Sequence, residues 1–203
     1  MNIIAHRGLW DTRKDQNSMS AFKRALDLGF GVELDVRDSF GHLVVSHDPT
    51  EDSGNLQFDE VIELFSQYES IMAINIKSDG LIPGLNLALR NTSKERYFVF
   101  DMSIPETIGY LNTGFPTFIR VSEFEELSPL HVNSSGIWLD AFESEWWTGQ
   151  SQVFQDFKAI CVVSPELHGR DEDSGWNFLR SFTPHNNLSL CTDYPVKASE
   201  YFK

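Results

Sequence analysis

The sequence predicts a barrel of eight parallel strands, each followed by a helix, in a single domain over residues 1–203. Short runs rich in Val, Ile, Leu and Phe recur along the whole chain, and segments with apolar residues at i, i+3 and i+4 separate them. Strands that helices bury on both faces are apolar almost throughout, which favours a parallel sheet. An open, doubly wound sheet has the same alternation and is the alternative fold.

Eight strand–helix units account for the sequence. The units average about 25 residues, compared with about 30 in a typical barrel of this class, so some helices must be short. The strands are expected at residues 2–7, 31–36, 71–77, 97–102, 116–121, 136–140, 159–164 and 188–193. The helices are expected at residues 18–29, 58–67, 81–90, 105–112, 122–127, 146–157, 174–182 and 196–202, of which 122–127 is the weakest.

Residues 37–48, RDSFGHLVVSHD, interrupt this rhythm after the second strand. The letters SFG supply a turn, and HLVVSH at 42–47 alternates like a short additional strand. The sequence therefore predicts a β-hairpin extension that brings His47 to the end of the second strand.

Composition restricts the class of partner. The formal charge of −14 argues against binding to nucleic acid or an anionic membrane, because both would be repelled at long range. No window approaches the roughly 18 apolar residues of a membrane helix, and no basic region followed by an apolar run marks a secretory signal, so we expect a cytoplasmic protein without a transmembrane segment. Cys161 and Cys191 lie in apolar runs and are expected to be buried free thiols. The sequence does not indicate an oligomeric state.

Polar residues concentrate where the expected strands end. The carboxyl ends of parallel barrel strands share one face, and active sites are built on that face. The residues at these positions are His6, Arg7, Glu33, Asp35, His47, Asn75, Lys77, Asp101, Arg120, Asp140, Glu166, His168 and Asp193.

Glu33 and Asp35 are two positions apart on one strand, so their side chains point to the same side. Two adjacent carboxylates repel each other unless a cation lies between them, and Mg²⁺ or Ca²⁺ would fill that role with oxygen ligands. A solvated or arginine-paired couple is the alternative.

His6 and His47 make the catalytic interpretation stronger. Two imidazoles beside a metal-held anionic group can supply a general base and a general acid near neutral pH. Arg7 and Lys77 add the fixed positive charge that a phosphodiester requires in so acidic a protein.

The ordered pattern resembles a known family. HRG at 6–8, followed by QNSMSAFKRALDLGFGVELDVRDSFGHLVVSHD at 16–48, is similar to the opening signature of the glycerophosphodiester phosphodiesterases. INIK at 74–77 and CTDYP at 191–195 resemble motifs of their third and last strands. The resemblance implies a TIM barrel that hydrolyses a small phosphodiester with a divalent ion.

The resemblance also implies roles for individual residues. His6 and His47 become the acid–base pair, Arg7 a phosphate ligand, and Glu33 and Asp35 metal ligands. Lys77 adds positive charge beside them.

The chain departs from the family pattern at two positions. Asn75 stands where the family usually has a metal-binding Glu, so an amide oxygen would replace a carboxylate and metal affinity should fall. Gln16 stands where the family's Glu-Asn pair has its acid. Glu166, or else Asp140, could restore the missing carboxylate; otherwise we expect Glu166 to pair with Arg170 or Arg120.

The leading hypothesis is a phosphoric diester hydrolase with a metal on Glu33, Asp35 and Asn75. The main alternative is a phosphate-ligand binding protein or pseudoenzyme with a weakened metal site. A third hypothesis, an aldolase or isomerase with Lys77 as a Schiff-base lysine, would leave the paired histidines without a role. The substrate alcohol is not indicated, because the fold does not select it.

Overall fold

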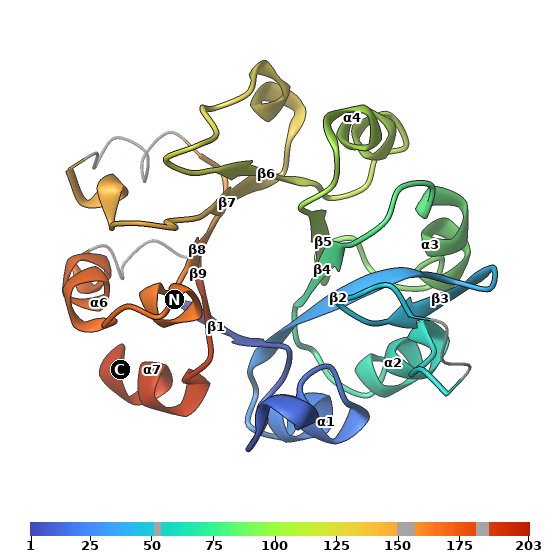
Figure 1. Ribbon diagram of the computed structural model, residues 1–203, viewed down its shortest axis with the longest axis horizontal. Helices are drawn as coiled ribbons and strands as arrows, with labels where there is room; N and C mark the ends of the chain where they lie inside the picture. The colour runs from blue at the N-terminus through green and yellow to red at the C-terminus, as the bar shows by residue number, and fades with distance from the viewer. Residues whose placement is uncertain (51–53, 150–156, 182–186) are drawn as a thin grey trace.

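The computed structural model describes residues 1–50, 54–149, 157–181 and 187–203. Within these residues the chain forms the expected barrel, with eight parallel strands around a central axis and helices outside them (Figure 1). The strand order is β5-β4-β2-β1-β9-β8-β7-β6. The first strand, β1, therefore pairs with the last, β9. This pairing is expected for a closed barrel and is not needed in an open doubly wound sheet.

The strands are short and nearly all buried, as the sequence predicts. They are β1 (Asn2–His6), β2 (Gly31–Ser39), β3 (His42–Val45), β4 (Met72–Ile76), β5 (Tyr97–Phe100), β6 (Phe118–Val121), β7 (Gly136–Leu139), β8 (Ile160–Val163) and β9 (Leu188–Thr192). All pair in parallel except β3, which pairs antiparallel with β2. The ring closes between β5 and β6 through a bridge from Val99 to Thr117.

The helices that cover the strands are α1 (Met19–Asp27), α2 (Phe58–Phe65), α3 (Ile82–Ala88), α4 (Ile104–Asn112), α6 (Asp173–Arg180) and α7 (Pro195–Tyr201). Short 3₁₀ turns are η1 (Arg13–Asp15), η2 (Pro129–Asn133), η3 (Trp146–Gly149) and η4 (Pro165–His168). None of the helices in the described ranges has the length and apolar character that a membrane crossing requires.

The pleat of the strands divides the core into an inner and an outer part. Alternate residues point into the barrel, where Phe98 stacks on Phe118 at 3.9 Å and Phe100 on Trp138 at 3.8 Å between ring centroids. The residues between them, such as Leu34, face the helices. Cys161 and Cys191 lie in the inner core as buried free thiols, as expected.

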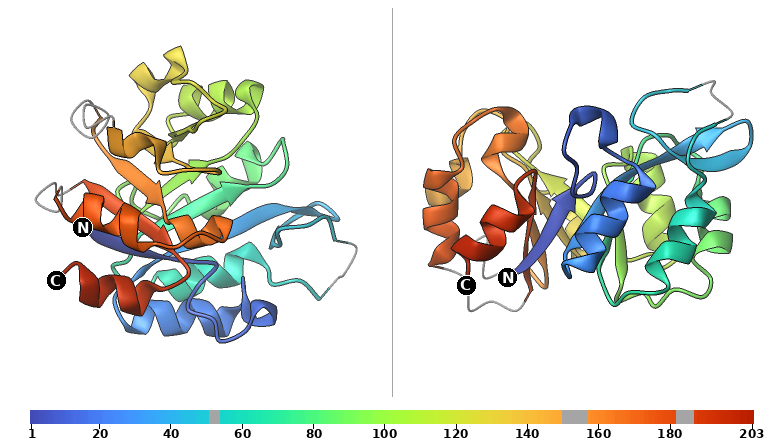
Figure 2. Two further views of the ribbon diagram at one scale, coloured as in Figure 1. Left: turned by 60° about the vertical axis from the view of Figure 1, so that its left-hand side comes forward. Right: turned by 90° about the horizontal axis from the view of Figure 1, so that it is seen from below.

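The hairpin after the second strand is present. Phe40 and Gly41 join β2 to β3 with φ values of 49° and 82°, and positive φ at both central residues is the pattern of a type I′ turn. The hairpin projects from the end of the barrel opposite to the two chain termini (Figure 2).

The sixth strand is not followed by the expected helix at 122–127. Ser122 and Glu125 form an isolated bridge and exchange backbone hydrogen bonds, so the segment is a turn. A helix this short gains little from its own hydrogen bonds, and the Glu123 carboxylate instead accepts backbone N–H groups from residues 142–144. The helix expected at 146–157 begins as η3, but residues 150–156 lie outside the described residues, as does 182 at the end of the 174–182 prediction.

Candidate functional site

The carboxyl ends of β1, β2 and β4 bring the predicted site residues together. His6 lies opposite Glu33 in the β1–β2 register, and Asp35 lies opposite Asn75 in the β2–β4 register. All four belong to the set of alternate positions that point into the barrel. Glu33, Asp35 and Asn75 are buried, with at most 9% of their surface exposed.

The turn that follows β1 has a constrained backbone. Arg7 has φ of 56° although it is not a glycine, and Gly8 follows with φ of 87°. A Cβ at Gly8 would lie 2.8 Å from the carbonyl carbon of Ala21, so only glycine fits there. This conformation directs the Arg7 backbone N–H to the Glu33 carboxylate at 3.2 Å, and such strain is typical of functional sites.

Asp35 is surrounded by donors and cations. Its Oδ2 accepts a hydrogen bond from Asn17 Nδ2 at 2.8 Å and lies 2.9 Å from Arg7 Nε. Its Oδ1 lies 3.4 Å from Lys77 Nζ. Two positive charges therefore offset this fully buried carboxylate.

Glu33 is less well compensated than Asp35. Its Oε1 accepts from Asn75 Nδ2 at 3.2 Å. Burial, together with the nearby charge of Asp35, raises the pKa of the Glu33 carboxyl above its ordinary value. A cation bound between Glu33 and Asp35 would relieve that repulsion.

His6 is held from both sides. Its Nδ1 lies 2.7 Å from Asp193 Oδ1, at the end of β9, and its Nε2 lies 3.9 Å from Glu33 Oε2. Burial lowers the pKa of His6, but the hydrogen bond to Asp193 and the charges of Glu33 and Asp193 outweigh burial and leave that pKa raised. The ring orientation is thus fixed, and Nε2 faces the Glu33 carboxylate.

The hairpin places His47 at the same end of the barrel. The backbone N–H of Ser46 donates to the Asp35 carbonyl oxygen at 3.0 Å, which ties the end of the hairpin to β2. His47 Nδ1 lies 2.8 Å from Asp48 Oδ1, and about half of the His47 side chain is exposed. The hydrogen bond from His47 lowers the pKa of Asp48, and the charge of Arg7 contributes in the same direction.

The residues present fit a divalent cation, with the Asn75 amide in the place where the family pattern predicts a carboxylate. Asp35 Oδ1 and Asn75 Oδ1 are buried oxygens without a hydrogen-bond partner. Oxygen donors of this kind suit Mg²⁺ or Ca²⁺. No group of three or more His, Cys, Asp and Glu residues is arranged for a metal within the described residues, so the Asn75 amide would have to act as the third ligand.

The charges continue around the barrel end beyond Lys77. Lys77 Nζ also lies 3.4 Å from Asp101 Oδ2, and Arg120 forms ion pairs with both Asp101 and Glu125. A cavity of about 250 Å³ adjoins Asp101 and Arg120 between α4 and the loop after β6.

Glu166 and Asp140 have other partners than the predicted metal ligands. The Glu166 carboxylate accepts hydrogen bonds from Ser164, from Thr192 and from the backbone N–H of Asp193. Asp140 accepts from the Ala141 N–H and lies 2.7 Å from His168 Nε2. Both carboxylates thus stabilise neighbouring elements.

The expected pairing of Glu166 with an arginine is wrong. Arg170 pairs with Glu145, and Arg120 pairs with the two carboxylates described above. Glu166 instead supports the turn that carries Asp193.

Sequence reasoning assigned no role to three residues of the site. Asp193 and Asp101 could be recognised only as polar residues at strand ends, and Asn17 only as part of the QN pair before α1. In the structure Asp193 holds His6, Asn17 holds Asp35, and Asp101 contacts Lys77.

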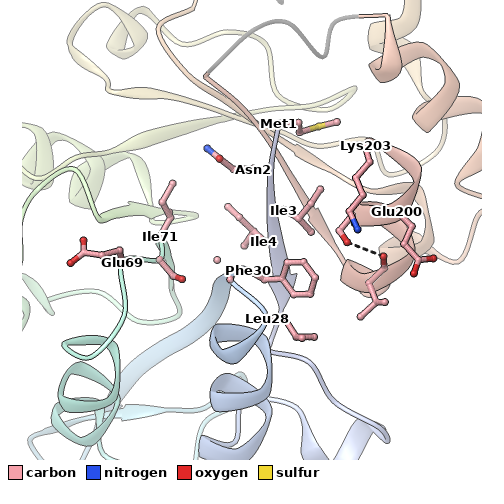
Figure 3. A pocket seen from close by; sticks show the side chains of 15 residues that line it. Met1, Asn2, Ile3, Ile4, Leu28, Phe30, Glu69, Ile71, Glu200 and Lys203 are labelled. Carbon is pink, nitrogen blue, oxygen red and sulfur yellow. Dashed lines mark hydrogen bonds between the residues drawn. The ribbon is translucent and has the colours of Figure 1, made fainter.

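A larger cavity lies at the opposite end of the barrel. It measures about 600 Å³ and is lined by the amino ends of β1 and β2 together with α7. Figure 3 shows Ile3, Phe30 and Ile71 beside Glu69 and Glu200 there. This end of a parallel barrel serves stability more often than catalysis, and it contains no histidine in its lining.

Comparison with known proteins supports the expected family. No family model matches the chain. A curated glycerophosphodiester phosphodiesterase from Caldanaerobacter subterraneus subsp. tengcongensis is 53% identical over 53 residues, which are 25% of this chain and 21% of that protein. The matched region thus spans about a fifth of the curated relative's length.

Solved structures are similar over nearly the whole chain. A glycerophosphodiester phosphodiesterase from Parabacteroides distasonis has a TM-score of 0.74 at 17% identity, covering 99% of this chain and 96% of that one. One from Agrobacterium tumefaciens has a TM-score of 0.70 at 18% identity, covering 99% and 98%. These similarities confirm the TIM-barrel fold, and all the named proteins carry the family name that the sequence resembles.

Proposed function

We propose that this chain is a phosphoric diester hydrolase that cleaves a small glycerophosphodiester-type substrate by paired-histidine acid–base catalysis. The observation that carries the proposal is the arrangement of His6, Arg7, Glu33, Asp35 and Lys77 at one end of the barrel, with His47 on the adjoining hairpin. The names of the similar proteins agree with this reaction class.

The phosphate group would lie over the ends of β1, β2 and β4. Arg7 and Lys77 lie there beside Asp35, and both are partly buried, with 22% and 17% of their side chains exposed. A charge in such surroundings is screened less by salt than a surface charge, so these cations can stabilise negative charge that develops on phosphate oxygens.

The two histidines would carry the protons. One imidazole removes the proton from the attacking hydroxyl, which belongs to water or to a neighbouring group of the substrate alcohol, while the other protonates the leaving oxygen. Asp193 and Asp48 each hold the Nδ1 side of one ring, so that Nε2 of His6 and of His47 is left for the substrate.

Glu33, Asp35 and Asn75 are the residues that would hold Mg²⁺ or Ca²⁺. When bound, such an ion supplies Lewis-acid stabilisation of a non-bridging phosphate oxygen. Its charge would relieve the repulsion between Glu33 and Asp35. Asn75 would contribute the buried Oδ1 that lacks a hydrogen bond.

The test is turnover of bis(p-nitrophenyl) phosphate and of a glycerophosphodiester by His47→Ala. We expect a loss of about 10²- to 10⁴-fold because a proton-transferring group is removed. His42→Ala is the matched control, since His42 lies on the same hairpin at its exposed turn and should leave turnover unchanged. Full activity in His47→Ala would remove the proposed mechanism.

One observation favours a second candidate, a phosphate-ligand binding protein. Arg7 and Lys77 both form ion pairs with Asp35, so cations of the chain already offset the charge of one predicted metal ligand. Calorimetric titration with Mg²⁺ and Ca²⁺ separates the two candidates. Absence of binding up to millimolar concentration, together with binding of inorganic phosphate, would favour the binding protein.

A further inference from the structure

We propose that Asp101 is a positioning residue that keeps the Lys77 ammonium away from the predicted metal ligand Asp35. The inference rests on the proposed function, because it concerns the same metal site. It extends that proposal to Asp101, the residue that directly follows β5, to which the sequence signature assigns no role.

The Lys77 ammonium lies at the same distance from two carboxylates. Its Nζ lies 3.4 Å from Asp35 Oδ1 and 3.4 Å from Asp101 Oδ2. Both distances are longer than the 2.7–2.9 Å of a tight charge-assisted hydrogen bond. The ammonium is therefore held between its partners and is bound closely by neither.

Asp101 is itself fixed in place. It follows β5 with φ of 71°, a left-handed conformation that Asp and Asn tolerate better than most residues. Arg120 on β6 forms an ion pair with its other oxygen, Oδ1, and Glu125 in turn pairs with Arg120. The carboxylate thus has a defined direction toward Lys77.

The position of Lys77 matters because of the oxygen that it approaches. Asp35 Oδ1 is buried and accepts no hydrogen bond, so it is the oxygen of this carboxylate that is available to a divalent cation. Without the pull of Asp101, the ammonium would have Asp35 as its remaining anionic partner and would move onto that oxygen. A lysine in that position competes directly with Mg²⁺ or Ca²⁺.

Asp101→Asn tests the idea with little change in shape. Asn keeps the tolerance for positive φ and removes only the charge. We expect the Kd for Ca²⁺, measured by calorimetry, to rise by about tenfold in Asp101→Asn. The same substitution made in a Lys77→Met background should leave the Kd of that background unchanged, because the competing ammonium is absent.

Two controls separate positioning from other effects. Asp140→Asn removes one negative charge from the same end of the barrel at a residue that pairs with His168, so it measures the general loss of charge alone. Thermal unfolding of each variant shows whether it is folded. Lys77→Gln, which can still donate to Asp35, replaces Lys77→Met if the latter does not fold.

Each outcome has a definite meaning. An equal loss of Ca²⁺ affinity from Asp101→Asn with and without Lys77 would overturn the inference and leave the proposed metal site standing. An unchanged Kd in Asp101→Asn would do the same. If the parent chain itself binds neither Ca²⁺ nor Mg²⁺, the inference and the metal site fall together, whereas the histidine test described above still decides the hydrolase.

Discussion

Two histidine–aspartate pairs at the same end of the barrel have the same nitrogen–oxygen distance, 2.7 Å, and different surroundings. His6 and Asp193 join β1 and β9 through Nδ1 of the ring, whereas His168 and Asp140, which lie after β8 and β7, are joined through Nε2. His6 faces Glu33 at 3.9 Å, whereas the His168 ring packs against Phe142 at 4.8 Å between centroids. A short histidine–aspartate contact is thus not enough to identify a catalytic site, and the neighbouring residues have to be considered.

Charge accounts for the difference between the two pairs. The first lies beside the buried carboxylate of Glu33, and the next inward-facing carboxylate on β2, Asp35, is paired with two cations. The second is enclosed by a loop in which Arg170 donates to the Ala141 and Phe142 carbonyl oxygens and Asp140 accepts from a backbone N–H. We therefore propose catalysis for the first pair and loop stabilisation for the second.

The largest expected effect is on turnover, when the histidine of each pair is replaced by alanine. His6→Ala should lower turnover of a glycerophosphodiester by about 10²- to 10⁴-fold, because a proton-transferring group is lost. His168→Ala should stay well below about 10²-fold, since that ring is engaged with a loop. Steady-state kinetics measures both, and equal losses would show that the comparison of surroundings is mistaken.

The next effect concerns the aspartates. Asp193→Asn should lower kcat by about 10- to 100-fold, because the partner that orients His6 loses its charge. Asp140→Asn is the matched substitution in the other pair and should change kcat little. A comparable drop in both variants would contradict the assignment.

A carboxylate at position 75 should strengthen cation binding at the site beside His6. Asn75→Asp adds a negative charge beside Glu33 and Asp35, and we expect the Kd for Ca²⁺ to fall by about tenfold, or about 1.4 kcal/mol. Calorimetry measures it. Asn133→Asp makes the same charge change at an exposed position near the amino end of β7 and should leave the Kd as it is. Weaker Ca²⁺ binding by Asn75→Asp would argue against a cation at this position.

The smallest effect is on stability as a function of pH. The pKa of His6 is raised in the folded chain above its ordinary value of 6.5, so its protonated form stabilises the fold. That contribution is fully present below about pH 6.5, the unfolded pKa, and is lost as pH rises through the folded pKa. Urea unfolding at several pH values should show that the stability gap between the parent and His6→Gln narrows with rising pH. A gap that widens would reverse the sign of the effect.

The barrel and the positions of the motif residues could be predicted because they depend on local patterns. Apolar strand runs, the helical spacing of 18–29 and the SFG turn are readable in short windows, and the rule that parallel strands end at one face then brings His6, Glu33 and His47 together. The prediction of a helix at 122–127 was wrong because Ser122 and Glu125 hydrogen-bond to each other and Glu123 accepts from the N–H groups of residues 142–144. The helix propensity of a short segment does not predict such tertiary hydrogen bonds.

The contacts between distant strands could not be predicted. Asp193 reaches His6 only because β9 closes against β1, across 187 positions of sequence. The equal approach of Lys77 to Asp35 and Asp101 depends on side-chain conformations that no spacing encodes. The sequence predicts that Glu166 either completes the metal site or pairs with an arginine, whereas in the structure its carboxylate accepts hydrogen bonds from two buried hydroxyls and a backbone N–H.

The most direct test of the central claim is ³¹P NMR of a glycerophosphodiester incubated with the parent chain, His6→Ala and the His6→Ala/His47→Ala double variant, each with Mg²⁺ or Ca²⁺. We expect the parent to convert the diester resonance into a phosphomonoester resonance, while both variants leave it nearly unchanged. A diester that persists with the parent chain, or that disappears equally fast with the double variant, would contradict the account.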